Sequence, residues 1–191
     1  MVIEKDFYQN IGFKHFFSQT DFPATQEIGM ALNDEDFLTI SIELAEQLKE
    51  PYFAFMVALS SHTPYEIPAE LEQLDLAGYE DSLLKGYYET VHYVVGAVGE
   101  MIEELKQKDL WDGFLIVFYG DGDRDRGLTQ PDSEMAQELV DETKVELFEV
   151  DHQVPLFIKE PDMETGSTVD SIGGQIDIAP AILYAWANLD R

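Results

Sequence analysis

Three aspartates and two arginines follow an apolar run in the stretch FLIVFYGDGDRDRG, residues 114–127. The carboxylates are Asp121, Asp123 and Asp125, and the guanidinium groups are Arg124 and Arg126. Alternating carboxylates are able to place oxygen ligands around a hard cation, and a guanidinium matches the geometry of a phosphate. Two interpretations are open: a cation or phosphate site, and a solvated turn whose ion pairs contribute about 0–1 kcal/mol each.

A second polar loop, SSHTPYEIP at residues 60–68, also follows an apolar run. His62 lies in this loop among hydroxyl-bearing residues. An imidazole with hydroxyl neighbours suits the binding of an anionic substrate, and the alternative is an ordinary loop histidine. We therefore treat His62 as a candidate substrate-binding residue.

Several other kinds of site are excluded or disfavoured. The chain has no cysteine, which excludes disulfides, thiolate catalysis and cysteine zinc sites. An EF-hand that began at Asp121 would require glycine at position 126 and glutamate at position 132, where the sequence has Arg126 and Asp132. The sequence also has neither a Walker loop nor a G-x-S-x-G elbow.

Three runs that are apolar on both faces predict buried strands at residues 52–60, 114–119 and 154–159. Segments with helical spacing lie before, between and after them, at residues 33–51, 82–108, 131–143 and 176–189. This order predicts an α/β fold, with a mixed, largely parallel sheet flanked by helices. Ligands gather beyond the carboxyl ends of parallel strands, so we expect His62 and Asp121 on one rim.

The length of the chain indicates the number of domains, and its net charge disfavours some classes of partner. The 191 residues predict a single domain over residues 1–191. With 11 Lys and Arg against 39 Asp and Glu, the net charge is −28, which repels nucleic acid. No run approaches the roughly 18 apolar residues of a membrane helix. We expect no nucleic-acid partner and no signal or membrane segment in these residues.

An ordered set of segments resembles a known family. The segments are ALNDEDF, SSHTPYEIP, YYETVHYVVGAVGEMIEELK, DGFLIVFYGD, VPLFIKEP and GGQIDIAPAIL. Together they resemble the C-terminal part of the lipoteichoic acid synthase-like phosphoglycerol transferases, in the sulfatase and alkaline phosphatase superfamily. The resemblance implies an enzyme on the extracellular face of the cell membrane. Such an enzyme transfers glycerol phosphate from phosphatidylglycerol, with a threonine nucleophile and a divalent metal, manganese or magnesium.

The resemblance also implies roles for individual residues. Asp121 corresponds to a metal ligand of the family, and His62 to the histidine that contacts the substrate phosphate. Arg124 is a further candidate for the phosphate, with neutralisation of its acidic neighbours as the alternative. Gly122 stands where the family has a second metal ligand, a histidine, so we expect weak or absent metal binding.

The resemblance covers only a partial sulfatase-like catalytic domain. In the family, the N-terminal half brings the threonine nucleophile and another acidic metal ligand, and residues 1–191 show no counterpart of either. We therefore expect this chain alone to be inactive and a missing N-terminal half to be its partner. Two alternatives stay open: a non-catalytic remnant that binds a partner, and a metal-dependent hydrolase of phosphate or sulfate esters. Whether the chain is a fragment or a complete gene product is also open.

Overall fold

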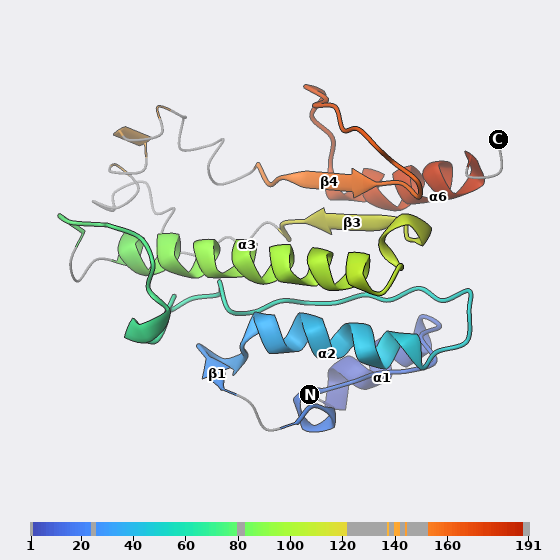
Figure 1. Cartoon of the computed structure of the whole chain (residues 1–191), viewed down its shortest axis with the longest axis horizontal. Coiled ribbons are helices and arrows are strands. Elements are labelled where there is room, and N and C mark those ends of the chain that lie inside the picture. The colour runs from blue at the N-terminus through green and yellow to red at the C-terminus, as the bar shows by residue number, and fades with distance from the viewer. Residues whose placement is uncertain are drawn as a thin grey trace. The chain divides into compact units, whose positions relative to one another are not determined.

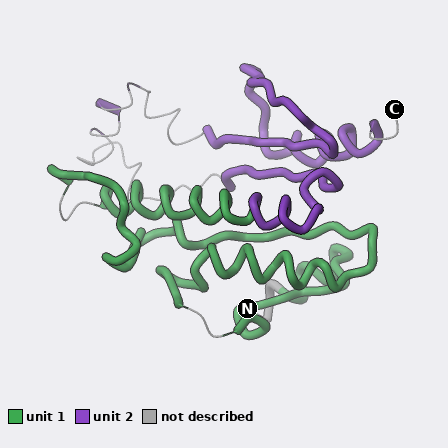
Figure 2. The backbone as a smooth tube through the Cα atoms, in the orientation of Figure 1, with its two compact units in different colours: residues 1–101 green, residues 102–191 purple. Residues whose placement is uncertain are grey.

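The computed structural model describes residues 2–23, 26–79, 83–121 and 153–188, together with residues 137, 140, 141 and 144. The chain divides into two compact units, residues 1–101 and 102–191 (Figure 2). The single domain expected over residues 1–191 stays a prediction.

Unit 1 contains helices α1 (Val2–Asn10) and α2 (Asp34–Glu46), and most of α3 (Leu83–Gln107). Its strands β1 (Glu27–Ile28) and β2 (Ala31–Leu32) form an antiparallel pair. Single turns of 3₁₀ helix lie at Gln19–Asp21 and Ala69–Leu71. Figure 1 labels α1, α2, α3 and β1 of this unit.

Helix α2 begins where the sequence predicts. The Asn33 side chain accepts a hydrogen bond from the N–H of Asp36 (2.9 Å) and so caps the first turn. Three acidic residues, Asp34, Glu35 and Asp36, occupy that turn, where negative charge favours the helix dipole. Leu38, Ile42 and Ala45 recur at helical spacing and are buried. The other buried apolar side chains of this unit are Ile28, Leu32, Tyr65, Leu84, Ala97 and Met101.

Residues 52–58 correct one prediction. They belong to neither of the two sheets in the described part of the chain, so the predicted buried strand at 52–60 is wrong. Phe53 is 64% exposed, and Phe55 and Val57 are also exposed. An apolar run forms a buried strand only where neighbouring strands supply hydrogen bonds and cover both faces.

Unit 2 contains strands β3 (Ile116–Tyr119) and β4 (Leu156–Lys159), a 3₁₀ turn at Trp111–Gly113, another at Gln175–Asp177, and helix α6 (Ile178–Asn188). Figure 1 shows β3 and β4 side by side. Both strands lie where the sequence predicts them, which confirms the α/β class. Most of the helix predicted at residues 131–143 lies outside the described residues.

Strand β4 pairs with β3 antiparallel, with Ile116 opposite Lys159 and Tyr119 opposite Leu156. A mixed sheet, as predicted, includes antiparallel pairs. Apolarity on both faces indicates burial, whereas strand direction is set by the path of the connecting chain. None of the helices in the described part of the chain has the length and apolarity that a membrane crossing requires.

Candidate functional site

His62 lies in a tight turn that follows residues 52–58. Its N–H donates to the carbonyl oxygen of Leu59 (3.1 Å), and its own carbonyl oxygen accepts the N–H of Tyr65 (3.0 Å). The Tyr65 side chain is buried, and its ring packs edge to face against Tyr87 of α3 at a centroid distance of 5.4 Å. The backbone on both sides of His62 is therefore held, while the imidazole itself is exposed.

The imidazole of His62 has one satisfied and one available nitrogen. Nδ1 lies 2.8 Å from the carbonyl oxygen of Thr63. A carbonyl oxygen only accepts, so Nδ1 carries the proton. Among the described residues, no side chain or backbone group makes a hydrogen bond to Nε2 of this ring. In the protonated form of the imidazole Nε2 also carries a hydrogen, and an anion such as a phosphate is a suitable acceptor for it.

A buried carboxylate lies beneath this turn. Asp34, the first residue of α2, accepts hydrogen bonds from the N–H of Leu59 (3.1 Å) and from the N–H of Ser60 (3.3 Å to each oxygen). In return, the N–H of Asp34 donates to Oγ of Ser60 (3.0 Å). Burial raises the pKa of Asp34 above its ordinary value, and the N–H groups of Leu59 and Ser60 oppose that shift. From the sequence, Asp34 is only one residue of the helical segment at 33–51, and no pattern connects it with the His62 loop.

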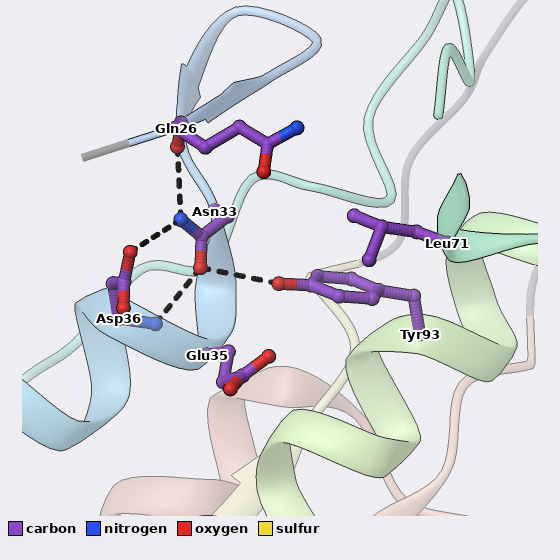
Figure 3. A pocket seen from close by; sticks show the side chains of 6 residues that line it. All are labelled: Gln26, Asn33, Glu35, Asp36, Leu71 and Tyr93. Atoms are coloured by element: carbon purple, nitrogen blue, oxygen red, sulfur yellow. Dashed lines mark hydrogen bonds between the residues drawn. The ribbon is translucent and has the colours of Figure 1, made fainter. Parts of the chain in front are cut away.

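A small polar cavity of about 210 Å³ lies beside the start of α2. Figure 3 shows the residues that line it, namely Gln26, Asn33, Glu35, Asp36, Leu71 and Tyr93. The Tyr93 hydroxyl donates to Oδ1 of Asn33 (3.1 Å), and Nδ2 of Asn33 donates to Gln26 O (2.9 Å) and to Asp36 Oδ2 (2.7 Å). Burial raises the pKa of Tyr93 to about 12. These groups satisfy one another, so the network ties β1, α2 and α3 together.

Asp121 follows β3 with only Gly120 between them, and its side chain is exposed. The amide of Gln175 donates to the carbonyl oxygens of Asp121 (2.6 Å) and Gly120 (3.3 Å). A Cβ at Gly120 would lie 2.9 Å from Cβ of Val154, so glycine permits the close approach of the two chain segments. The backbone of Asp121 is thus fixed, and Gln175 is a positioning contact that sequence reasoning missed.

The described residues do not by themselves form a metal centre. Asp121 supplies one carboxylate, and the described part of the chain holds no group of three or more His, Asp or Glu side chains able to bind a metal ion. Gly122 and Arg124 lie outside the described residues. His62 belongs to unit 1 and Asp121 to unit 2, so the shared rim stays a prediction.

The chain is similar in sequence to lipoteichoic acid synthases. Lipoteichoic acid synthase 1 of Bacillus subtilis (strain 168) is 29% identical over 180 residues, which are 93% of this chain and 28% of that protein. Lipoteichoic acid synthase of Staphylococcus aureus (strain USA300) is 24% identical over 93% of this chain and 27% of that protein. The chain therefore spans less than a third of the length of these relatives.

Solved structures agree with these sequence relatives. The crystal structure of the lipoteichoic acid synthase LtaP from Listeria monocytogenes matches with a TM-score of 0.79 and 29% identity, covering 94% of this chain and 45% of that chain. A protein of the alkaline phosphatase superfamily from Vibrio parahaemolyticus, 19% identical with a TM-score of 0.66 over 90% of this chain and 38% of that chain, shares the fold. The family model for sulfatases matches residues 2–188. The chain therefore belongs to the sulfatase family.

Proposed function

We propose that this chain is the phosphate-binding part of a phosphoglycerol transferase that acts in lipoteichoic acid-type polymer synthesis. The observation that carries the proposal is His62, an exposed residue in a hydrogen-bonded turn. Its Nδ1 donates to the Thr63 carbonyl oxygen, and its Nε2 has no hydrogen-bond partner among the described residues. The names of the relatives support it, because proteins similar over 93% of this chain are lipoteichoic acid synthases. The substrate is an anionic glycerol phosphate group, and the reaction takes place on the extracellular face of the cell membrane.

Three residues have proposed roles. The imidazolium of His62 donates to a phosphate oxygen. Arg124 is a further phosphate-binding residue, because a planar guanidinium matches the geometry of a phosphate. Asp121 supplies one carboxylate to a divalent metal, manganese or magnesium. With Gly122 in place of a histidine, this site binds the metal weakly, because transition-metal sites commonly combine imidazole with carboxylate.

The chain alone is proposed to be inactive. Covalent transfer requires an activated nucleophile and stabilisation of the charge that develops in the transition state. The family places its threonine nucleophile in the N-terminal half, which has no counterpart in residues 1–191. We propose that this half is the partner of the chain and packs against the exposed apolar side chains of residues 53–57.

A binding experiment on the 191-residue chain tests the proposed role of His62. The probe is glycerophosphoglycerol, a phosphodiester with the headgroup chemistry of phosphatidylglycerol, added at about 0.15 M salt to screen the negative charge of the chain. We expect the imidazole resonances of His62 to shift on binding. We also expect His62→Gln to weaken binding by about tenfold or more, because a hydrogen bond to a charged group is lost.

The matched control is His92→Gln. His92 is also exposed and belongs to unit 1, but it lies on α3, where its Nε2 is 3.4 Å from Oε1 of Gln73. Its replacement should leave the affinity for glycerophosphoglycerol unchanged. Equal affinity of the wild-type chain and His62→Gln, or no binding by the wild-type chain, would contradict the proposed function.

A further inference from the structure

We infer that Asp34 is a positioning residue for His62: its buried carboxylate fixes the turn that presents the imidazole to the substrate phosphate. The expected effect of Asp34 on substrate binding rests on the proposed function. The link between Asp34 and the orientation of the ring stands on the contacts of unit 1.

The contact between Asp34 and the turn is reciprocal and buried. The carboxylate accepts the N–H groups of Leu59 and Ser60, and Oγ of Ser60 accepts the N–H of Asp34. Asp34 and Ser60 are each 1% exposed. Removal of the carboxylate therefore leaves the N–H of Ser60 as a buried donor without its acceptor. The first turn of α2 and the segment before His62 are held as one piece.

The path from Asp34 to His62 is short. Leu59 donates its N–H to Asp34 and accepts the N–H of His62 through its carbonyl oxygen. Leu59 thus accepts the hydrogen bond that closes the turn and also donates a hydrogen bond to Asp34. The turn places the ring of His62 where Nδ1 reaches the carbonyl oxygen of Thr63. The hydrogen bond at Nδ1 determines which nitrogen of the ring is protonated.

The geometry also explains why the residue is an aspartate. The N–H of Ser60 lies 3.3 Å from both carboxylate oxygens of Asp34, and the N–H of Leu59 lies 3.1 Å from one of them. An asparagine has one acceptor oxygen and presents an NH₂ group at the other position. Asp34→Asn therefore keeps the size of the side chain and weakens the contact, whereas Asp34→Ala removes it.

The chain contains a matched control in Glu89. This carboxylate is also 1% exposed and accepts two backbone N–H groups, from Gln73 (2.9 Å) and Leu74 (3.0 Å). Glu89→Ala thus removes the same kind of buried contact from a different loop. Any effect on His62 that follows only from a loss of stability should appear in both alanine variants.

The first measurement needs no ligand. The ¹⁵N shifts of the His62 ring in the full 191-residue chain report which nitrogen is protonated, with His62→Gln used for assignment. We expect the Nδ1–H form in the wild-type chain and in Glu89→Ala, and a mixture of both tautomers in Asp34→Ala. Amide exchange at Leu59 and Ser60 should become at least about tenfold faster in Asp34→Ala only, because hydrogen-bonded amides exchange through local opening.

The second measurement is the affinity for glycerophosphoglycerol. Asp34→Ala should weaken binding by about tenfold, Asp34→Asn by less, and Glu89→Ala by less than about twofold. If the wild-type chain does not bind this probe, the proposed function fails while the tautomer measurement still decides the inference. If Asp34→Ala does not fold, Asp34→Asn carries the test. An unchanged His62 tautomer in the Asp34 variant, or equal effects of the Asp34 and Glu89 variants, would overturn the inference.

Discussion

The close approach of α3 to the His62 loop gives a sharp test of the packing in unit 1. Gly86 lies in α3, and a Cβ built at this position would be 2.5 Å from the carbonyl oxygen of Tyr65 and 3.2 Å from its Cβ. The nearest of these atoms belongs to the backbone, so the clash is not relieved by a rotamer change. Overpacking of this kind costs about 1–3 kcal/mol.

Gly86→Ala combines this cost with a gain. Alanine favours a helix over glycine by up to about 1 kcal/mol, so the two contributions oppose each other in the measured free energy of unfolding. Gly96 lies in the same helix, and a Cβ there meets nothing within 4 Å. Gly96→Ala therefore has the gain without the clash. The difference between the two variants isolates the steric cost, which we expect to be about 1–3 kcal/mol.

Urea denaturation followed by circular dichroism measures both free energies of unfolding. We expect Gly96→Ala to be more stable than the wild-type chain and Gly86→Ala to be less stable than Gly96→Ala. Since the N–H of Tyr65 donates to the carbonyl oxygen of His62, Gly86→Ala should also weaken the binding of glycerophosphoglycerol. Equal stability of the two alanine variants would refute the close contact between Gly86 and Tyr65.

Four further predictions follow from the structure and the proposed function. Burial favours the neutral phenol of Tyr93 and raises its pKa to about 12 from an ordinary 10.0. The contribution of Tyr93 to stability is therefore present below pH 10 and is lost as the pH rises through about 12. The free energies of unfolding of the wild-type chain and of Tyr93→Phe should converge across this pH range. Gln175→Ala should lower the free energy of unfolding by about 0.5–1.5 kcal/mol in urea denaturation, because the carbonyl groups of Gly120 and Asp121 lose a donor, and an unchanged value would count against this contact. Calorimetric titration at high ionic strength should show weak manganese binding by the chain and a modest gain in Gly122→His, whereas tight one-to-one binding by the unmutated chain would contradict the loss of a ligand. The purified chain should not cleave phosphatidylglycerol, and manganese-dependent turnover that Asp121→Ala abolishes would favour the hydrolase alternative.

Local sequence predicted those parts of the fold that depend on neighbouring residues. Helix α2 and strands β3 and β4 lie in segments that the sequence predicts, and α2 starts with a cap at Asn33 and an acidic first turn. Capping is a contact between residues three positions apart, and the short apolar runs at β3 and β4 are consistent with strands. The motif around His62 and the position of Asp121 after β3 are local in the same sense.

Only the tertiary structure decided the features that depend on distant segments. The antiparallel direction of β4 and the exposure of Phe53 depend on which chain segments lie alongside, and apolarity on both faces carries no such information. The need for glycine in α3 also depends on distant segments. A Cβ at Gly86 would clash with the backbone of Tyr65, whereas a Cβ at Gly96 would meet nothing within 4 Å. Close packing therefore explains Gly86 but not Gly96.

The candidate site also combines features that the sequence identifies with features that only the structure shows. The sequence identified His62 as a substrate-binding candidate from its loop, but neither the available Nε2 nor the buried support from Asp34 follows from the sequence. Asp34 and Ser60 are 26 residues apart, and no spacing rule connects an acid in a helix's first turn with a loop at that distance. Hydrogen bonds between such segments form only once the chain has folded, because folding removes the water that would otherwise satisfy the same groups.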